Sequence, residues 1–157
     1  MELNRYDYDI IAWAKEQAQL VRSKQFDLLD LEHIAEEIED VGKSEQRELA
    51  TRMSVLVCHL LKWHYQPNKR SISWFTTIAN QRDDLADLLT DNPGLKQYLP
   101  ELLEKAYRNA RREAASETAL VLSTFPEECP YSLSQILDPN FLCNTTNDFN
   151  YAMNSKG

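Results

Sequence analysis

The stretch that decides the fold is SVLVCHLLKWHYQP, residues 54–67. Between Val55 and Leu61 it is apolar on almost every side of a helix, with His59 as the interruption. A helix that is apolar all round is normally buried against several neighbours. Proline cannot continue a helix, so Pro67 ends it, and Ser44 is a suitable residue to cap its start. The sequence therefore predicts a central, buried helix over about 44–66.

Outward from this helix, apolar residues recur at intervals of three and four, and no segment alternates with period two. Gly42 is expected to end or bend the preceding helix, and Ser132 and Gln135 have the spacing of a capping box for a short final helix. The prediction is an all-α, single-domain bundle over 1–142, with five long helices and a short C-terminal one. The long helices are expected at about 7–23, 31–42, 44–66, 71–90 and 100–124. Residues 143–157 are expected to form a tail that is mobile or strapped to the surface.

Composition excludes several classes of protein. The chain has 157 residues, 43% of them hydrophobic, which suits one domain with a core. Its longest apolar run is far short of the ~20 residues that a membrane-spanning helix needs. The acidic and aromatic start does not resemble a secretory signal, and the three cysteines lack any C-x-x-C pair. We therefore expect a cytoplasmic protein without a disulfide framework or a thiolate zinc site.

Charge is distributed unevenly along the chain, whose net charge is −8. Residues 27–48 contain nine acidic side chains and two basic ones, whereas residues 49–82 contain five basic and no acidic ones. Neighbouring helices could complement one another in this way, leaving a solvated acidic surface. A sharper interpretation is that Lys69 and Arg70, close in sequence to Trp63 and Trp74, bind phosphates or bases. The acidic total argues against nucleic acid as a partner.

Two charged residues fall on apolar helix faces. Arg82 lies at the centre of a stripe formed by Phe75, Ile78, Ala79, Leu85, Ala86 and Leu89. Glu117 lies in the stripe of the following helix, made by Leu99, Leu103, Ala106, Tyr107, Ala110, Ala114 and Val121. Because an unpaired ion is costly to bury, we predict that Arg82 pairs with Glu117 or that both join one network.

Further polar residues could join such a network. Gln17 lies within the apolar stripe of the first helix, to which Trp13 also belongs, and Glu37 and His59 lie at the edges of the stripes of the second and third helices. One interpretation is a network of ion pairs and hydrogen bonds that fixes the packing register. The other is a cleft in which Glu37, His59, Arg82 and Glu117 form a general-base or anion-binding site. The sequence alone leaves both open.

A metal site would be a specific form of the second interpretation, since helical bundles often hold metals through inward Glu and His side chains. The Glu-x-x-His spacing of di-iron bundles is missing, because the residues three before the histidines are Asp30, Leu56 and Leu61. His33, Glu37 and His59 remain as weak candidate ligands. We therefore expect neither a bound metal nor a cofactor.

The chain also carries a set of short fragments in a specific order, each of them weak when taken alone. They include Ile34-Ala35-Glu36-Glu37-Ile38, His59-Leu60-Leu61-Lys62, Gln81-Arg82, Glu117 and Phe125-Pro126. In their order and intervals they resemble a bacterial family known as domain of unknown function twenty-nine, over about 6–142. The resemblance implies an all-helical protein and no assigned activity.

Three functions therefore stay open. The first is a non-enzymatic protein-interaction module, with a homodimer as one form, that binds through its acidic helical face or the Trp74 region. The second is an enzyme or anion-binding protein built on the Glu/His/Arg network. The third is a nucleic-acid-associated protein.

Overall fold

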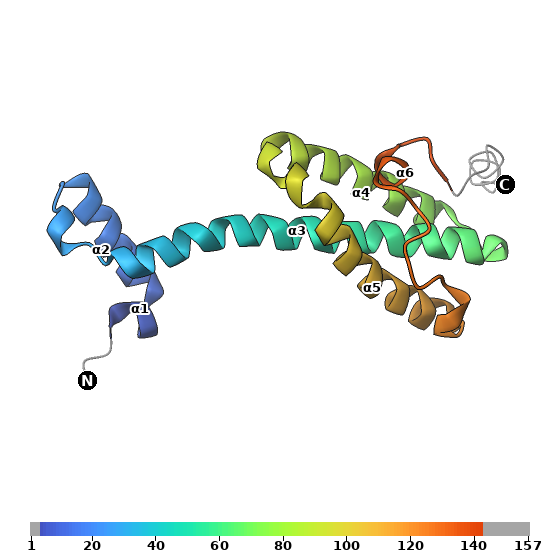
Figure 1. The fold of residues 1–157 in the computed structure, drawn as a ribbon, viewed down its shortest axis with the longest axis horizontal. Coiled ribbons are helices and arrows are strands. Elements are labelled where there is room, and N and C mark those ends of the chain that lie inside the picture. Colours follow the sequence, from blue (N-terminus) through green and yellow to red (C-terminus); the bar gives the residue numbers. More distant parts are fainter. Residues whose placement is uncertain (1–3, 143–157) are drawn as a thin grey trace. The chain divides into compact units, whose positions relative to one another are not determined.

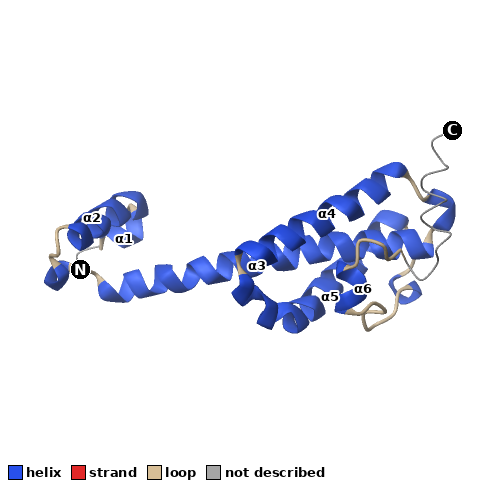
Figure 2. Ribbon diagram, turned by 90° about the horizontal axis from the view of Figure 1, so that it is seen from above, coloured by secondary structure: helices blue, strands red, loops and turns tan. Residues whose placement is uncertain are grey.

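The structure, a computed structural model, describes residues 4–142. These residues form helices joined by loops and short 3-10 turns, and no strand occurs among them (Figures 1 and 2). The helices are α1 (Arg5–Tyr8), α2 (Ile10–Arg22), α3 (Leu31–Tyr65), α4 (Ile72–Asp91), α5 (Leu99–Thr118) and α6 (Leu133–Leu137). The predicted all-α class is confirmed.

The chain divides into two compact units, Met1–Ser44 and Glu45–Gly157, and the boundary falls within α3. We call them the N-terminal unit and the C-terminal unit and describe each by itself. The predicted tail over 143–157 lies outside the described residues. The domain limits inferred from the sequence stay a prediction.

The separation of residues 31–42 and 44–66 into two helices is wrong, because α3 is continuous from Leu31 to Tyr65. Gly42 has no positive φ, and a Cβ added to it would meet no atom within 4 Å. Glycine lowers helix propensity by only about 1 kcal/mol relative to alanine, which a long helix tolerates. Four of the helices are therefore long, where the sequence predicted five.

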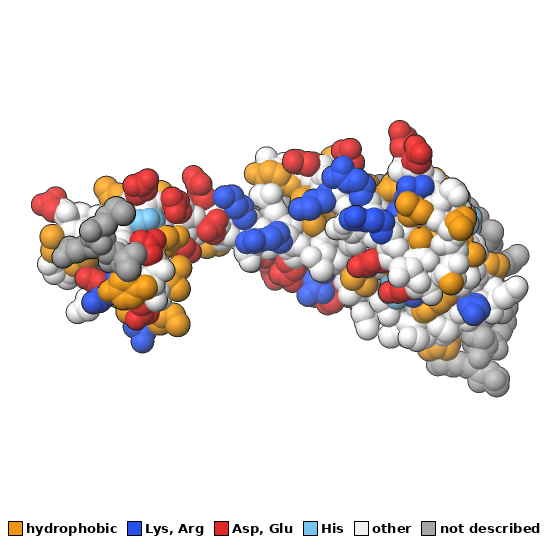
Figure 3. All heavy atoms as spheres, turned by 90° about the horizontal axis from the view of Figure 1, so that it is seen from below, with side chains coloured by type: hydrophobic (Ala, Val, Ile, Leu, Met, Phe, Trp, Pro, Cys, Tyr) orange, Lys and Arg blue, Asp and Glu red, His pale blue; other side chains and the backbone are white. Residues whose placement is uncertain are grey.

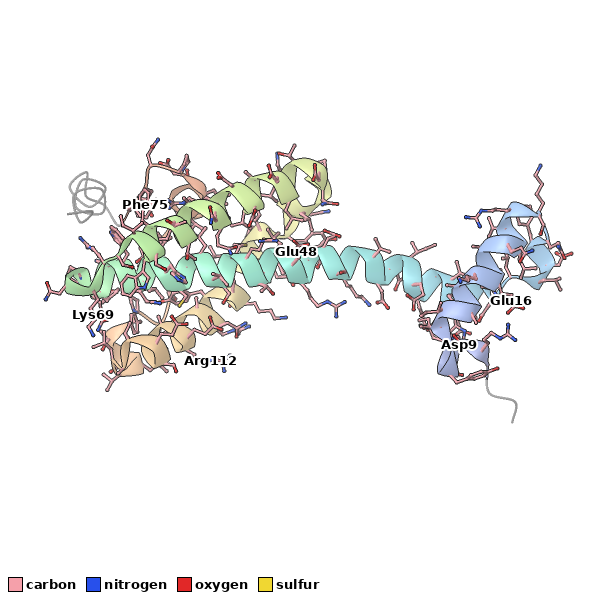
Figure 4. The ribbon with its side chains drawn as sticks, turned by 180° about the vertical axis from the view of Figure 1, so that it is seen from behind. Asp9, Glu16, Glu48, Lys69, Phe75 and Arg112 are labelled. Carbon is pink, nitrogen blue, oxygen red and sulfur yellow. The ribbon has the colours of Figure 1, made fainter. Side chains whose placement is uncertain are left out.

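Two other helix limits also differ from the prediction. The expected helix over 7–23 is broken at Asp9, whose side chain accepts a hydrogen bond from Ala12 N at 3.0 Å and starts α2 (Figure 4). The helix expected to reach Thr124 ends at Thr118, because Ala119 adopts a left-handed conformation with φ 59°. The capping box of Ser132 and Gln135 is confirmed at the start of α6.

The C-terminal unit holds the hydrophobic core. The second half of α3 lies at its centre, and seven of its side chains are fully buried: Leu49, Met53, Leu56, Val57, Leu60, Leu61 and Trp63. Helices α4, α5 and α6 supply further buried residues, among them Ile78, Leu85, Ala106, Ala110 and Ile136. The predicted central position of this part of α3 is confirmed.

The N-terminal unit is built from α1, α2 and the first part of α3, with only Trp13 and Gln17 buried among its described residues. Gln17 Oε1 accepts a hydrogen bond from Asp30 N at 2.8 Å, which ties α2 to the start of α3. The inward position predicted for Trp13 and Gln17 is thus confirmed. The unit joins its helices through polar contacts as much as through apolar packing.

Candidate functional site

The N-terminal unit carries an apolar groove with a volume of about 310 Å³. One wall comes from α2 and the other from the first part of α3, and we call this feature the α2–α3 groove. Its lining residues are Trp13, Ala14, Gln17, Ala18, Val21, Ile34, Glu37, Ile38 and Val41. They recur at helical spacing, so each helix presents one apolar stripe to the groove.

Large hydrophobic side chains of this unit are exposed to an unusual degree. Ile38 and Val41 are 67% and 66% exposed, and Val21 is 49% exposed. Outside the groove, the same unit exposes Tyr8, Ile10, Ile11, Phe26, Leu28 and Leu31. Exposed apolar groups that gather in one place often mark a site of interaction with another protein or a ligand. Figure 3 shows hydrophobic and acidic side chains side by side on this unit.

A polar and aromatic cluster lies beside the groove and centres on Asp30. Asp30 Oδ2 lies 2.7 Å from His33 Nδ1 and accepts hydrogen bonds from Trp13 Nε1 at 3.0 Å and Asn4 Nδ2 at 3.1 Å. Burial acts to raise the pKa of Asp30, but the hydrogen bonds from His33, Asn4 and Trp13 outweigh it and lower the pKa to about 2. The Asp30 carboxylate in turn raises the pKa of His33.

Tyr6 connects α1 to this cluster. Its ring stacks on that of His33, with ring centroids 4.0 Å apart, and forms a T-shaped contact with that of Trp13, with centroids 4.9 Å apart. Tyr6 Oη donates to Glu37 Oε1 at 2.8 Å, and this hydrogen bond raises the pKa of Tyr6 to about 12. Trp13 and Glu37 belong to both the cluster and the groove, so the cluster fixes the groove's walls.

In the C-terminal unit, the cation that pairs with Glu117 is Lys62. Lys62 Nζ lies 2.5 Å from Glu117 Oε2 and 4.7 Å from the centroid of the Trp74 ring. Lys62 is only 7% exposed, whereas the Glu117 side chain keeps 49% of its surface accessible. A buried lysine needs such a partner, because desolvation of an unpaired ammonium costs several kcal/mol. This ion pair joins α3 to α5.

The predicted pairing of Arg82 with Glu117 is wrong, although Arg82 does point inward and is 5% exposed. Arg82 Nε donates to the carbonyl oxygen of Ile136 at 2.9 Å, and Nη2 donates to that of Gln135 at 3.3 Å. These carbonyls belong to α6 and its last turn, where helix carbonyls lack partners within the helix. Arg82 therefore attaches α6 to α4.

Within the described part of the C-terminal unit, no hydrogen bond or ion pair joins His59, Arg82 and Glu117 to one another. Glu37 belongs to the N-terminal unit. His59 Nδ1 lies 2.8 Å from the carbonyl oxygen of Val55, so Nδ1 carries the proton. Burial lowers the pKa of His59, against smaller raising effects of this hydrogen bond and of the Glu117 charge.

Two of the three weak metal candidates form hydrogen bonds with other side chains. His33 contacts Asp30, and Glu37 accepts from Tyr6. Within residues 4–142, no three His, Cys, Asp or Glu side chains are grouped closely enough to hold a metal ion. The Cys58 thiol is buried, which raises its pKa to about 12, so it has little thiolate character at neutral pH.

Of the two tryptophans near Lys69 and Arg70, Trp63 is buried and Trp74 is partly exposed. Trp63 is fully buried, and the Arg70 guanidinium lies 5.2 Å from the centroid of its ring. Arg70 Nε also donates to the Trp63 carbonyl oxygen at 2.8 Å. Trp63 therefore has no exposed ring on which a base could stack.

The model of a family described as "Domain of unknown function DUF29" matches residues 5–142. The chain belongs to this family. No curated protein and no solved structure matches it.

Two features of this DUF29 chain escaped the sequence reasoning. One is the inward position of Lys62, which continues the stripe of Val55 and Cys58 at spacings of three and four, the signal for an inward side chain. The other is the exposure of Ile38 and Val41, because a stripe in the sequence does not show whether another helix covers it.

None of the described helices of this DUF29 chain is long and apolar enough to cross a membrane. This agrees with the prediction from its short apolar runs.

Proposed function

We propose that this protein is a non-enzymatic interaction module that receives a helix of another protein in the α2–α3 groove. The observation that carries the proposal is the exposure of Ile38 and Val41, two-thirds of whose surface is open to solvent beside the groove. Burial of apolar surface contributes about 25 cal/mol per Å². A ligand that covers this groove would gain that free energy.

The shape of the groove favours a helix as its occupant. Two adjacent helices that each present an apolar stripe can accept a third amphipathic helix, which inserts residues at spacings of three, four and seven. The residues Ile34 to Val41 on α3 and Trp13 to Val21 on α2 each span about two helical turns. We therefore expect two to three apolar anchors on the bound helix.

Site-specific photo-crosslinking in the cells that naturally produce the protein tests this proposal. A photoreactive amino acid at Ile38 should form adducts with another protein, whereas one at Val121, an equally exposed apolar residue of the C-terminal unit, serves as the matched control. The adduct should map to one amphipathic segment. A peptide of that segment should bind the purified chain and bind Ile38→Glu at least tenfold more weakly.

The proposal fails if Ile38 and Val121 give the same adducts, or if the mapped peptide binds Ile38→Glu as well as it binds the natural chain. A symmetric adduct between two copies would instead support the homodimer expected as one form of the module. We place this function in the cytoplasm, in keeping with the free thiols of Cys58 and Cys129.

The two other functions have less support. An enzymatic or anion-binding cleft would require Glu37, His59, Arg82 and Glu117 to act together, yet Arg82 donates to backbone carbonyls and Glu117 contacts Lys62. A nucleic-acid-associated function would need exposed stacking rings beside Lys69 and Arg70, yet Trp63 is buried, and the partly exposed Trp74 ring is already covered by the Lys62 ammonium at 4.7 Å.

A further inference from the structure

We infer that the helix received by the α2–α3 groove is cationic, with Lys or Arg residues along one edge of its apolar stripe. This inference rests on the proposed function and names the chemistry of its partner. It follows from the charges that surround the groove. The surface of the groove itself is almost entirely apolar.

The segment of α3 that supplies one wall of the groove is acidic. Between Leu31 and Val41 it contains five acidic side chains and no lysine or arginine. They are Glu32, Glu36, Glu37, Glu39 and Asp40. The α2 wall is nearly balanced, with Lys15 and Arg22 against Glu16. A cationic edge on the partner is therefore expected beside α3.

Few of these carboxylates form an ion pair with another described residue. Asp40 lies 3.6 Å from Lys43 in an exposed pair, and Glu37 accepts from the neutral Tyr6 hydroxyl. Glu32, Glu36 and Glu39 form no ion pair with any residue that the structure describes. The negative potential along this wall is thus left for a partner to neutralise.

Three of the carboxylates also repel one another. Glu32, Glu36 and Asp40 follow at intervals of four residues, and like charges at this spacing destabilise a helix. A helix with its side chains is about 10–12 Å wide, close to the Debye length of about 10 Å at 0.1 M salt. Charges on the outer side of α3 therefore still act on a helix bound in the groove, most strongly at low salt.

Three synthetic peptides of about 18 residues test the inference with the full chain. They share one leucine stripe for the groove and carry Lys, Gln or Glu along its edge. Affinities are measured by fluorescence anisotropy in 50 mM and 500 mM NaCl. We expect the Lys peptide to bind roughly tenfold more tightly than the Gln peptide at 50 mM, with the difference falling to about threefold or less at 500 mM.

Neutralised variants locate the effect. Glu36→Gln/Glu39→Gln/Asp40→Asn should reduce the advantage of the Lys peptide several-fold. Asp83→Asn/Asp87→Asn/Asp91→Asn removes three exposed acids from α4 and should leave that advantage unchanged. All six positions are exposed, so neither variant disturbs the core.

The outcomes separate this inference from the proposed function. If the Lys and Gln peptides bind equally at low salt, and Ile38→Glu weakens both, the partner is not selected by charge and the groove still binds helices. If no peptide binds, or Ile38→Glu leaves binding unchanged, both proposals are wrong. If the chain alone forms a dimer that Ile38→Glu disperses, the groove belongs to a second copy and the cationic partner is excluded.

Discussion

Lys62 and Glu117 form an ion pair between α3 and α5 in which one member is buried and the other is half exposed. This asymmetry predicts different costs for removing the two partners. Glu117→Gln leaves a buried ammonium without its counter-charge and should destabilise the protein by about 1–3 kcal/mol. Lys62→Met leaves a carboxylate that water can solvate and should cost less.

Urea denaturation of the two single variants and the double variant measures this pair directly. The double-mutant cycle should give a coupling free energy of about 1 kcal/mol. The exposed pair Arg5–Glu16 serves as a control and should give less than about 0.5 kcal/mol. Equal costs for the two single variants would contradict the asymmetric burial.

Arg82→Met should detach α6. The variant removes the donors to the carbonyl oxygens of Ile136 and Gln135, and loss of charged hydrogen bonds at a buried site costs about 2–4 kcal/mol. Hydrogen exchange should therefore accelerate in 133–137 more than in α4. Arg82→Lys should rescue only part of the loss, because an ammonium does not match the two-carbonyl geometry. Unchanged exchange in 133–137 would refute this role.

Replacement of Gly42 by alanine tests the continuity of α3. Because Gly42 has no positive φ and a Cβ would have open space around it, Gly42→Ala should stabilise the protein by about 0.5–1 kcal/mol. Circular dichroism and urea denaturation measure the effect. A destabilised variant would show instead that the chain bends at this residue, as the sequence first indicated.

The two histidines with shifted pKa values should titrate on opposite sides of about 6.5, the usual value. Contact with Asp30 raises the pKa of His33, and burial lowers that of His59. NMR titration of the imidazole signals measures both. Asp30→Asn should lower the pKa of His33 and leave that of His59 in place. The reverse order of the two pKa values would contradict the described surroundings.

The shifted pKa values of Asp30 and His33 predict how the stability of the N-terminal unit depends on pH. Because folding lowers the pKa of Asp30, its carboxylate stabilises the folded unit at pH values above about 3.9, the pKa of an unfolded aspartate. This stabilisation is lost as the pH falls toward about 2. The raised pKa of His33 contributes stability below about 6.5, which is lost as the pH rises through its folded pKa. Hydrogen-exchange protection of α2, corrected for intrinsic rates, should peak between about pH 4 and 6.5. Asp30→Asn should flatten that peak.

The sequence predicted those features that depend on local spacing. Residues 55–61 indicated the central helix, Ser132 and Gln135 indicated the start of α6, and the stripe around Arg82 showed that its side chain points inward. It did not predict partners across helices, because Lys62 and Arg82 were equally available cations for Glu117. Which of them reaches Glu117 depends on how α3, α4 and α5 are rotated when they pack.

The sequence could not predict the α2–α3 groove for a related reason. Ile34, Ile38 and Val41 follow one another at helical spacing, but an apolar stripe does not distinguish a covered face from an open one. Only the fold reveals that the N-terminal unit buries Trp13 and Gln17 among its described residues and leaves Ile38 exposed. The acidic helical face was predicted as a possible binding face, and Glu37 is the acidic residue among those that line the groove.

The most direct test of helix binding is methyl NMR of the full chain with a spin-labelled cationic amphipathic peptide. Binding in the α2–α3 groove should broaden the methyl signals of Val21, Ile34, Ile38 and Val41. The signals of Val121 and Leu122, which are exposed apolar residues of the C-terminal unit, should stay sharp. Broadening of Val121 and Leu122 with sharp groove signals, or no broadening at saturating peptide, would contradict the account.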